Sequence, residues 1–267
     1  MVRPPVRGGD VFMVAIAMPA ARARPAFYVW MASACALIAI GAFVPTYWMQ
    51  LPAGTVVGTP LLHLHAAAFT AWPLLFLSQT WLAASGGLKH HRAWGLVGIS
   101  LATALFLIGA ATAIENGAVR AAAYGGAALA FMIVPLTQIA LFAGFFTAAV
   151  ANLRRPEWHK RLMLVATFML LQAPIARVFF LARTGGGPGM RPGTGPPTSM
   201  MNGIGPALAL DLLLLAAILY DWRTRGHPHP AYLIGAAVLV TVQFARIPLS
   251  ATSEWQAFAQ ALTAFAG

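Results

Sequence analysis

Two histidines, His63 and His65, open an otherwise apolar stretch, TPLLHLHAAAFTAWPLLFLSQTWLAASGG, that begins at Thr59. An imidazole ring can bind a metal, hold a cofactor or hydrogen-bond a ligand, and at a membrane surface it can also lie with one end in water. Positions i and i+2 of a helix point about 200° apart, so both rings reach one site only if the helix start is unwound. We predict that His65, the deeper of the two, is the functional ring and that His63 is interfacial.

Four more polar side chains interrupt later apolar stretches at a similar depth: Arg177, Asp211, Gln243 and Arg246. An acid within PALALDLLLLAAILY is costly in lipid and usually faces the interior of a helix bundle. We expect Asp211 to pair with Arg177 or Arg246, either as a structural ion pair or within a ligand pocket that also contains His65 or His63. Two arginines against one acid leave a positive charge, which suits an anionic or carbonyl-bearing ligand.

A second group of histidines begins two later helices, in KHHRAWG and WHKRLML. Two neutral imidazoles from neighbouring helices are what the iron of a b-type haem needs, and helix bundles host such cofactors. His91 and His159 are the candidates for these ligands. The alternative is that both rings anchor the chain among lipid headgroups. No zinc-protease, phosphate-loop or dinucleotide motif is present, and no protein metal site is predicted.

The composition requires elements that suit a membrane. Hydrophobic residues make up 60% of the 267 and charged residues only 9%, whereas a soluble domain averages about a quarter charged residues. The apolar stretches are long and show no alternation, which favours helices over a β-barrel. The sequence therefore predicts an all-α integral membrane protein, a bundle of about seven transmembrane helices. The predicted spans cover residues 26–44, 60–84, 93–114, 124–151, 159–181, 204–220 and 231–250, with a kink at Pro135.

The net charge of +11 indicates orientation in a lipid bilayer rather than nucleic-acid binding, because the basic residues stand beside apolar stretches. One side of the predicted bundle has twelve basic residues: Arg3, Arg7, Arg22, Arg24, Lys89, Arg92, Arg154, Arg155, Lys160, Arg161, Arg223 and Arg225. The other side has Arg120, Arg183 and Arg191. The positive-inside rule then places the N-terminus in the cytoplasm and the C-terminus outside.

Three regions follow from this reading. Residues 1–25 form a cytoplasmic N-terminal segment that we expect to be disordered or interfacial. A signal peptide is the rival, but Asp10 adjoins its short apolar patch and Arg22 and Arg24 occupy the cleavage region. Residues 26–250 form a single transmembrane domain, and residues 251–267 form a short outer tail with an amphipathic turn or two.

The segment from Leu61 to Phe180 resembles a family of uncharacterised bacterial multi-pass inner-membrane proteins. The shared features are a histidine at a helix mouth (His65 or His63), His91-Arg92 before Gly95 and Gly98, and His159 followed by Lys160-Arg161. The layout is also distantly similar to b-type transmembrane cytochromes. The resemblance implies the architecture and no activity.

These observations lead to the expectation of a redox-associated or small-ligand-binding membrane protein with an outward-facing polar pocket, and with haem b as the one cofactor suggested. There are two alternatives. One is a transporter or receptor for a small anionic or carbonyl ligand, and the other is an accessory subunit that assembles with other membrane subunits. The bacterial inner membrane is the expected location.

Overall fold

The computed structural model describes residues 26–56, 58–185, 195–197 and 199–265, and all its regular elements in these ranges are helices. The predicted N-terminal segment 1–25 lies outside the described residues. The long helices are α1 (Ala26–Gly41), α2 (Pro60–Ala84), α3 (Leu88–Tyr124), α5 (Ile133–Ala151), α6 (Pro156–Met169), α7 (Gln172–Thr184), α8 (Ile204–Arg225), α9 (Pro230–Ser250) and α10 (Ser253–Ala264). Shorter elements are the π-helical turn η1 (Val44–Trp48), α4 (Gly126–Phe131) and the 3₁₀ turn η2 (Met200–Gly203).

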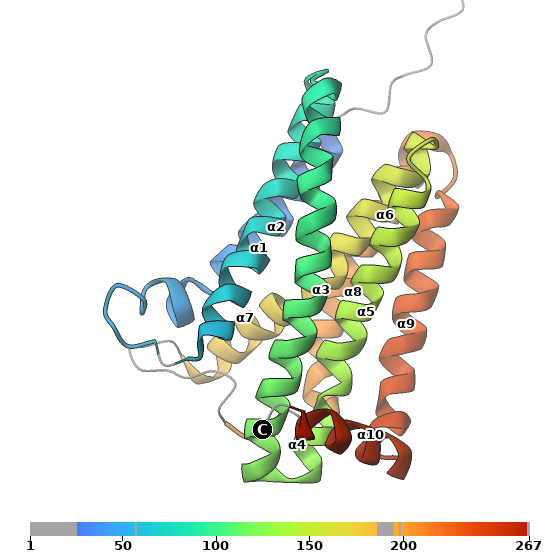
Figure 1. The fold of residues 1–267 in the computed structure, drawn as a ribbon. Helices are drawn as coiled ribbons and strands as arrows, with labels where there is room; N and C mark the ends of the chain where they lie inside the picture. The colour runs from blue at the N-terminus through green and yellow to red at the C-terminus, as the bar shows by residue number, and fades with distance from the viewer. Residues whose placement is uncertain (1–25, 57, 186–194, 198, 266–267) are drawn as a thin grey trace, which may run out of the picture.

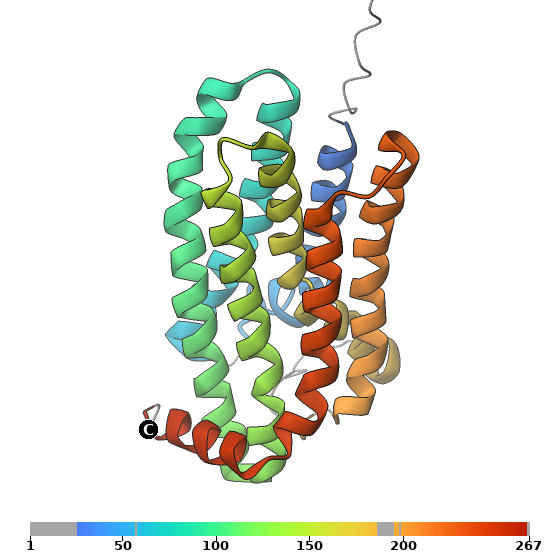
Figure 2. The ribbon, with the colours of Figure 1, turned by 90° about the vertical axis from the view of Figure 1, so that its right-hand side faces the viewer.

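Within the described residues, seven helical stretches are long and apolar enough to cross a membrane, which confirms the predicted number. This is the architecture of a multi-pass membrane protein. The helices form an upright bundle (Figures 1 and 2). Helix α6 is the most enclosed, because Leu164, Val165, Ala166 and Phe168 expose no surface.

Helix α3 is longer than predicted, because it continues through Glu115 and Gly117 to Tyr124. The Glu115 carboxylate accepts a hydrogen bond from the Thr59 hydroxyl at 3.2 Å, so this charge does not end the helix. Gly117 is a packing position: a Cβ atom there would lie 2.3 Å from the Met132 sulfur. Glu115 and Gly117, which were interpreted as the end of the helix, instead contact neighbouring segments.

Three of the seven stretches have a break just before a proline, and the first of these breaks separates α1 from η1 before Pro45. Pro135 follows the break at Met132, as the predicted kink required, and Pro174 follows a break at Leu170–Leu171 that was not predicted. Proline cannot donate to the carbonyl four residues earlier, and its ring crowds that carbonyl. Helix α7 consequently turns away from the axis of α6 (Figure 1). Broken backbone at membrane depth is tolerated where it is buried in protein or lines a cavity.

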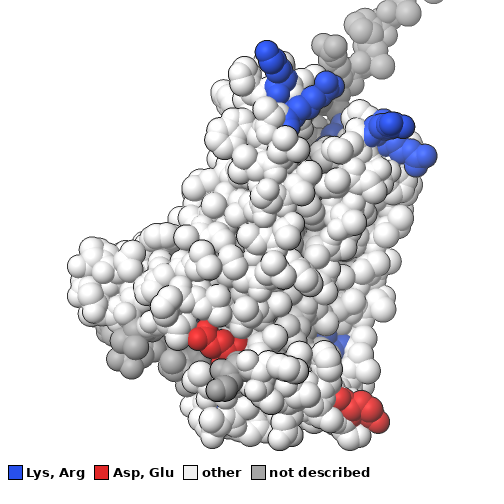
Figure 3. Space-filling model, viewed as in Figure 1, with Lys and Arg blue, Asp and Glu red and all other residues white. Residues whose placement is uncertain are grey.

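The loops from α2 to α3, from α5 to α6 and from α8 to α9 meet at one end of the bundle, which we call the basic end (Figure 2). Its exposed basic residues are Lys89, Arg92, Arg154, Arg155 and Arg223. Figure 3 shows the basic side chains gathered at this end and acidic side chains toward the other. The fold thus assembles the charge asymmetry that the sequence predicts.

The tail beyond residue 250 is more ordered than predicted, because α10 is a helix of 12 residues. It lies across the end opposite the basic end (Figure 2). The Thr252 side chain caps it by accepting the N–H of Trp255 at 3.2 Å, and Trp255 donates its indole N–H to the Leu129 carbonyl at 2.9 Å. Ala259, a residue of α10 itself, is fully buried.

Candidate functional site

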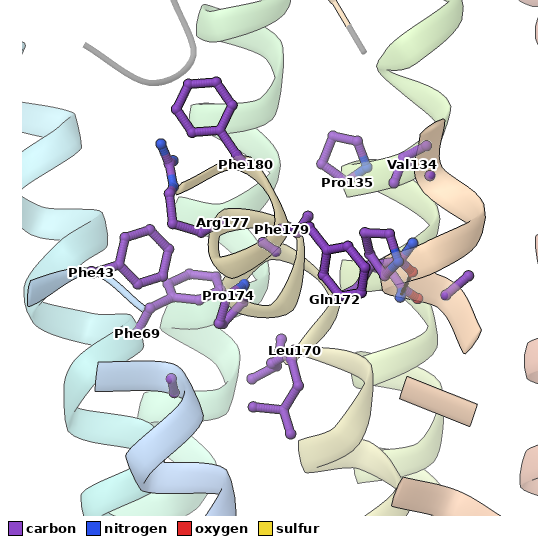
Figure 4. A pocket seen from close by; sticks show the side chains of 18 of the residues that line it. Phe43, Phe69, Val134, Pro135, Leu170, Gln172, Pro174, Arg177, Phe179 and Phe180 are labelled. Carbon is purple, nitrogen blue, oxygen red and sulfur yellow. Dashed lines mark hydrogen bonds between the residues drawn. The ribbon is translucent and has the colours of Figure 1, made fainter. Parts of the chain in front are cut away.

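A cavity of about 1010 Å³ opens among η1, α2, α5, α7, α8 and α9, on the side of the bundle where α6 breaks from α7. Its walls are mainly apolar, and Figure 4 shows Phe43, Phe69, Phe179 and Phe180 around it. A cavity of this size can enclose a drug-sized or lipid-like molecule. Because the break exposes the start of α7 to the cavity, Gln172 and Pro174 belong to the wall.

Five of the six residues predicted for the pocket line this cavity: His65, Arg177, Asp211, Gln243 and Arg246. His63 is not among the lining residues. Its Nδ1 atom lies 2.8 Å from the hydroxyl of Tyr47, in η1. Helix α2 is regular from Pro60 onward, with Thr59 as its N-cap, so the two rings point in different directions as the helical spacing requires.

The predicted ion pair of Asp211 with an arginine is wrong. The Asp211 Oδ1 atom accepts a hydrogen bond from Gln243 Nε2 at 3.1 Å, and within the described ranges no basic side chain lies at ion-pair distance from it. Asp211 is half-buried on the cavity wall, so its carboxylate is not enclosed in the way that would require a counter-ion. The two arginines point elsewhere. Arg177 lies over the Phe43 ring, with its guanidinium carbon 5.3 Å from the ring centre (Figure 4).

Arg246 is held by two other helices. Its Nε donates to the Thr137 hydroxyl at 2.7 Å, and its Nη1 donates to Gln172 Oε1 at 3.3 Å. Gln138 also donates its Nε2 to Gln172 Oε1. A guanidinium only donates, so the atom of Gln172 that faces it must be the oxygen. Gln138 therefore turns its amide nitrogen to Gln172, and its own oxygen is left over.

Unpartnered polar atoms collect at this cavity. Across the described residues, five buried side-chain polar atoms have no hydrogen-bond partner, and four belong to residues that line the cavity: Thr46 Oγ1, His65 Nδ1, Gln138 Oε1 and Arg246 Nη2. An unsatisfied buried donor or acceptor costs about 1–3 kcal/mol, so native proteins rarely keep one without a reason. The His65 ring is fixed by stacking on Phe69, with ring centres 4.0 Å apart. The walls are apolar, but the site is prepared for polar contacts.

The structure also brings the second pair of candidate residues close together. The rings of His91 and His159, at the starts of α3 and α6, have centres 6.5 Å apart and planes 82° apart. His91 Nδ1 lies 3.3 Å from the Gln79 carbonyl, and His159 Nδ1 lies 2.9 Å from the Ala149 carbonyl. A carbonyl only accepts, so each Nδ1 carries a proton, and Nε2 is the nitrogen of each ring that remains for a ligand. The fifth unpartnered atom, Gln79 Nε2, belongs to the residue that fixes His91. The described residues contain no cluster of three or more side chains suited to a metal ion.

Sequence reasoning missed a buried ion pair near the basic end. Arg161 is 1% exposed and Asp221 is fully buried, and two hydrogen bonds of 2.7 Å join the guanidinium to both carboxylate oxygens. The third guanidinium nitrogen donates to the Glu157 carbonyl and carboxylate, at 2.9 and 2.5 Å. From the sequence, Arg161 was counted among the basic residues of one side and Asp221 received no role, whereas α6 and α8 bury both side chains. The usable signal was the scarcity of acids: the chain has six Asp and Glu, so an acid beside a long span is a strong candidate for a partner.

His229 completes this network. Its backbone N–H donates to Asp221 Oδ2 at 3.2 Å, and its Nδ1 caps α9 by accepting the N–H of Ala231 at 3.1 Å. Burial, together with the positive charge of Arg161, lowers the pKa of His229. The ring therefore stays neutral at pH 7 and can act as an acceptor.

No family model, no curated protein and no solved structure matches this chain.

Proposed function

We propose that this chain is a bacterial inner-membrane protein that binds a small amphipathic molecule in the cavity beside the α6–α7 break. The observation that supports this best is that four of the buried, unpartnered polar atoms belong to residues that line one apolar cavity. A ligand with a polar headgroup would satisfy atoms that the protein leaves open, and its apolar part would lie against the aromatic walls. Binding would then offset the cost of leaving these atoms unbonded.

The charges on the wall indicate the kind of headgroup. Arg177, Arg183 and Arg246 line the cavity together with the single acid Asp211, so an anionic or carbonyl oxygen is favoured there. Transporters also place ligands at broken helices, whose half-helix N-termini carry partial positive charge. The α6–α7 break beside Arg246 fits that arrangement. A carrier or a receptor for such a ligand therefore agrees with the geometry better than a purely structural subunit.

Ligand-dependent thermal stability in detergent tests the proposal. Tetradecanoate is expected to raise the melting temperature, whereas tetradecan-1-ol, with the same chain and no carbonyl, is expected to have little effect. Arg246→Gln should remove the stabilisation by tetradecanoate. The matched control is Arg223→Gln, because Arg223 is exposed at the basic end. Equal stabilisation by the acid and the alcohol, or full stabilisation of the Arg246 variant, would contradict the proposal.

The orientation that we propose has the basic end in the cytoplasm, since positive residues flanking membrane spans are retained inside. Leu153, between α5 and α6, and Ser253, at the start of α10, are both exposed and lie at opposite ends of the bundle. In a Cys35→Ala background, Ser253→Cys should react with an impermeant thiol reagent on spheroplasts, and Leu153→Cys should react only after lysis. The reverse pattern would invert the topology.

A second function, electron transfer through haem b, is favoured by the geometry of His91 and His159. The two rings come from the starts of α3 and α6 with centres 6.5 Å apart, so His91 and His159 are the residues that would hold the iron of a haem. The backbone carbonyls fix both rings and leave Nε2 of each available for a metal. The cations of the basic end, such as Arg92, would disfavour a free metal cation and suit the propionates of haem. When bound, haem supplies a one-electron couple, and the chain holds it through His91 and His159.

The absorption spectrum of the purified protein tests this second function. We expect a Soret band that is lost in His91→Ala and in His159→Ala. His90→Ala is the matched control, because His90 is the exposed neighbour of His91. Absence of the band, both as purified and after addition of haemin, would exclude this role. Co-purification with other membrane proteins, without ligand or haem, would instead indicate an accessory subunit.

A further inference from the structure

One glutamine oxygen organises the polar part of the cavity wall. Gln172 Oε1 accepts hydrogen bonds from Arg246 Nη1 and from Gln138 Nε2. The two atoms left without partners, Arg246 Nη2 and Gln138 Oε1, therefore belong to groups that meet at the same oxygen. Arg246, Gln138 and Gln172 are 4%, 7% and 8% exposed, and Thr137 fixes the guanidinium from its other side. We call Gln138, Gln172 and Arg246 the amide–guanidinium cluster.

The two unpartnered atoms of this cluster, both buried, have opposite requirements. Arg246 Nη2 is a cationic donor and needs an acceptor, whereas Gln138 Oε1 is an acceptor and needs a donor. A plain carboxylate satisfies the arginine alone and brings a negative oxygen near the amide oxygen. An alcohol satisfies the amide oxygen but leaves the guanidinium charge unpaired. Only a headgroup with both functions on neighbouring atoms satisfies the cluster.

The chain also indicates how such a headgroup would lie. Gln172 is the first residue of α7, so the positive end of this helix adds to the charge of Arg246. Gln138 stands on α5 and donates to the same Gln172 oxygen as Arg246 of α9. The negative oxygen is therefore favoured on the side of α7 and α9, and the donor on the side of α5. Because both groups meet at one oxygen, the donor must be close to the acid along the ligand.

We infer that the ligand is a long-chain hydroxy acid, whose carboxylate pairs with Arg246 and whose hydroxyl, close to the acid group, donates to Gln138 Oε1. The apolar chain lies against the aromatic walls of the cavity. This inference rests on the proposed function, because it names the headgroup of the ligand that the cavity is proposed to bind.

The test compares the dissociation constants of three compounds with the same chain, measured by tryptophan fluorescence of the full-length protein. 3-Hydroxytetradecanoate is expected to bind about tenfold more tightly than tetradecanoate, the effect of one added hydrogen bond to a buried acceptor. 3-Methoxytetradecanoate keeps the oxygen and lacks the donor, so it should lose this advantage. In Gln138→Met the preference for the hydroxyl should fall to within about twofold, and Gln260→Met, an exposed change on α10, should retain it.

Three outcomes would count against the inference. Equal binding of the hydroxy and plain acids by the unaltered protein would overturn it and leave the proposed function standing. An undiminished advantage in Gln138→Met would also overturn it. No binding of any of the three acids would contradict the proposed function itself. The comparison with the methoxy compound uses the unaltered protein. The inference can therefore be tested even if the Gln138 variant does not fold.

Discussion

Replacing Asp221 by Asn is expected to lower the free energy of unfolding by about 3–5 kcal/mol, because one partner of a buried ion pair is removed and the other remains. Arg161 is enclosed by α6, α8 and α9, and both of its bonds to Asp221 are 2.7 Å long. Glu157 still contacts the guanidinium, but it is half-exposed and also bound by Lys160 and Arg225. It cannot replace both oxygens of Asp221. The measurement is the melting temperature of the purified variant in detergent.

Asp211→Asn is the matched control for this change, because Asp211 lies on the same helix and has an amide as its partner. An asparagine at position 211 can still accept the hydrogen bond from Gln243 Nε2, so the expected loss is small. A large loss in the Asp211 variant together with native stability in the Asp221 variant would reverse the assignment of the structural acid. Similar losses in both would mean that Asp211 has a counter-ion after all.

The difference between these two acids shows what could be predicted from the sequence. The seven spans follow from the length of apolar stretches, because lipid cannot satisfy an open backbone. The depth of a residue in the membrane also follows from its position in the helix, because the rise per residue is fixed. This is why a similar depth was predicted for His65, Arg177, Asp211, Gln243 and Arg246. The rotation of each helix does not follow. Whether Asp211 meets an arginine or Gln243 depends on how α8 and α9 are turned, and the two options differ by a fraction of a turn.

The amide–guanidinium cluster was beyond sequence reasoning for a related reason. Gln138 and Gln172 look like ordinary polar residues within apolar helices. Gln138 follows Pro135, which was predicted as a kink, and Gln172 precedes Pro174, whose break was not predicted. The cluster exists because Pro174 breaks the span and starts α7 at Gln172, next to Arg246 of α9. By contrast, the different directions of the His63 and His65 rings follow from their spacing within one helix, so they could be predicted.

His65→Ala is expected to weaken binding of tetradecanoate at least tenfold, whereas His63→Ala should change it less than twofold. His65 lines the cavity, its Nδ1 is buried without a partner, and its ring stacks on Phe69. Its removal costs both a polar contact and part of the aromatic wall, and a lost hydrogen bond to a buried group alone is worth about 1–3 kcal/mol, or roughly fivefold to more than a hundredfold in affinity. Tryptophan fluorescence titration of each variant gives the comparison.

His63 is linked to the cavity wall through Tyr47, which it contacts at 2.8 Å and which lines the cavity. Tyr47→Phe removes the hydroxyl of this contact and keeps the ring, so it is the control for any indirect effect of His63. If His63→Ala and Tyr47→Phe are both mild while His65→Ala is severe, the two histidines have separate roles, as a regular helix requires. If His63→Ala is as severe as His65→Ala while Tyr47→Phe is mild, His63 reaches the ligand itself. The start of α2 must then unwind on binding, since only an unwound segment turns both rings toward one site.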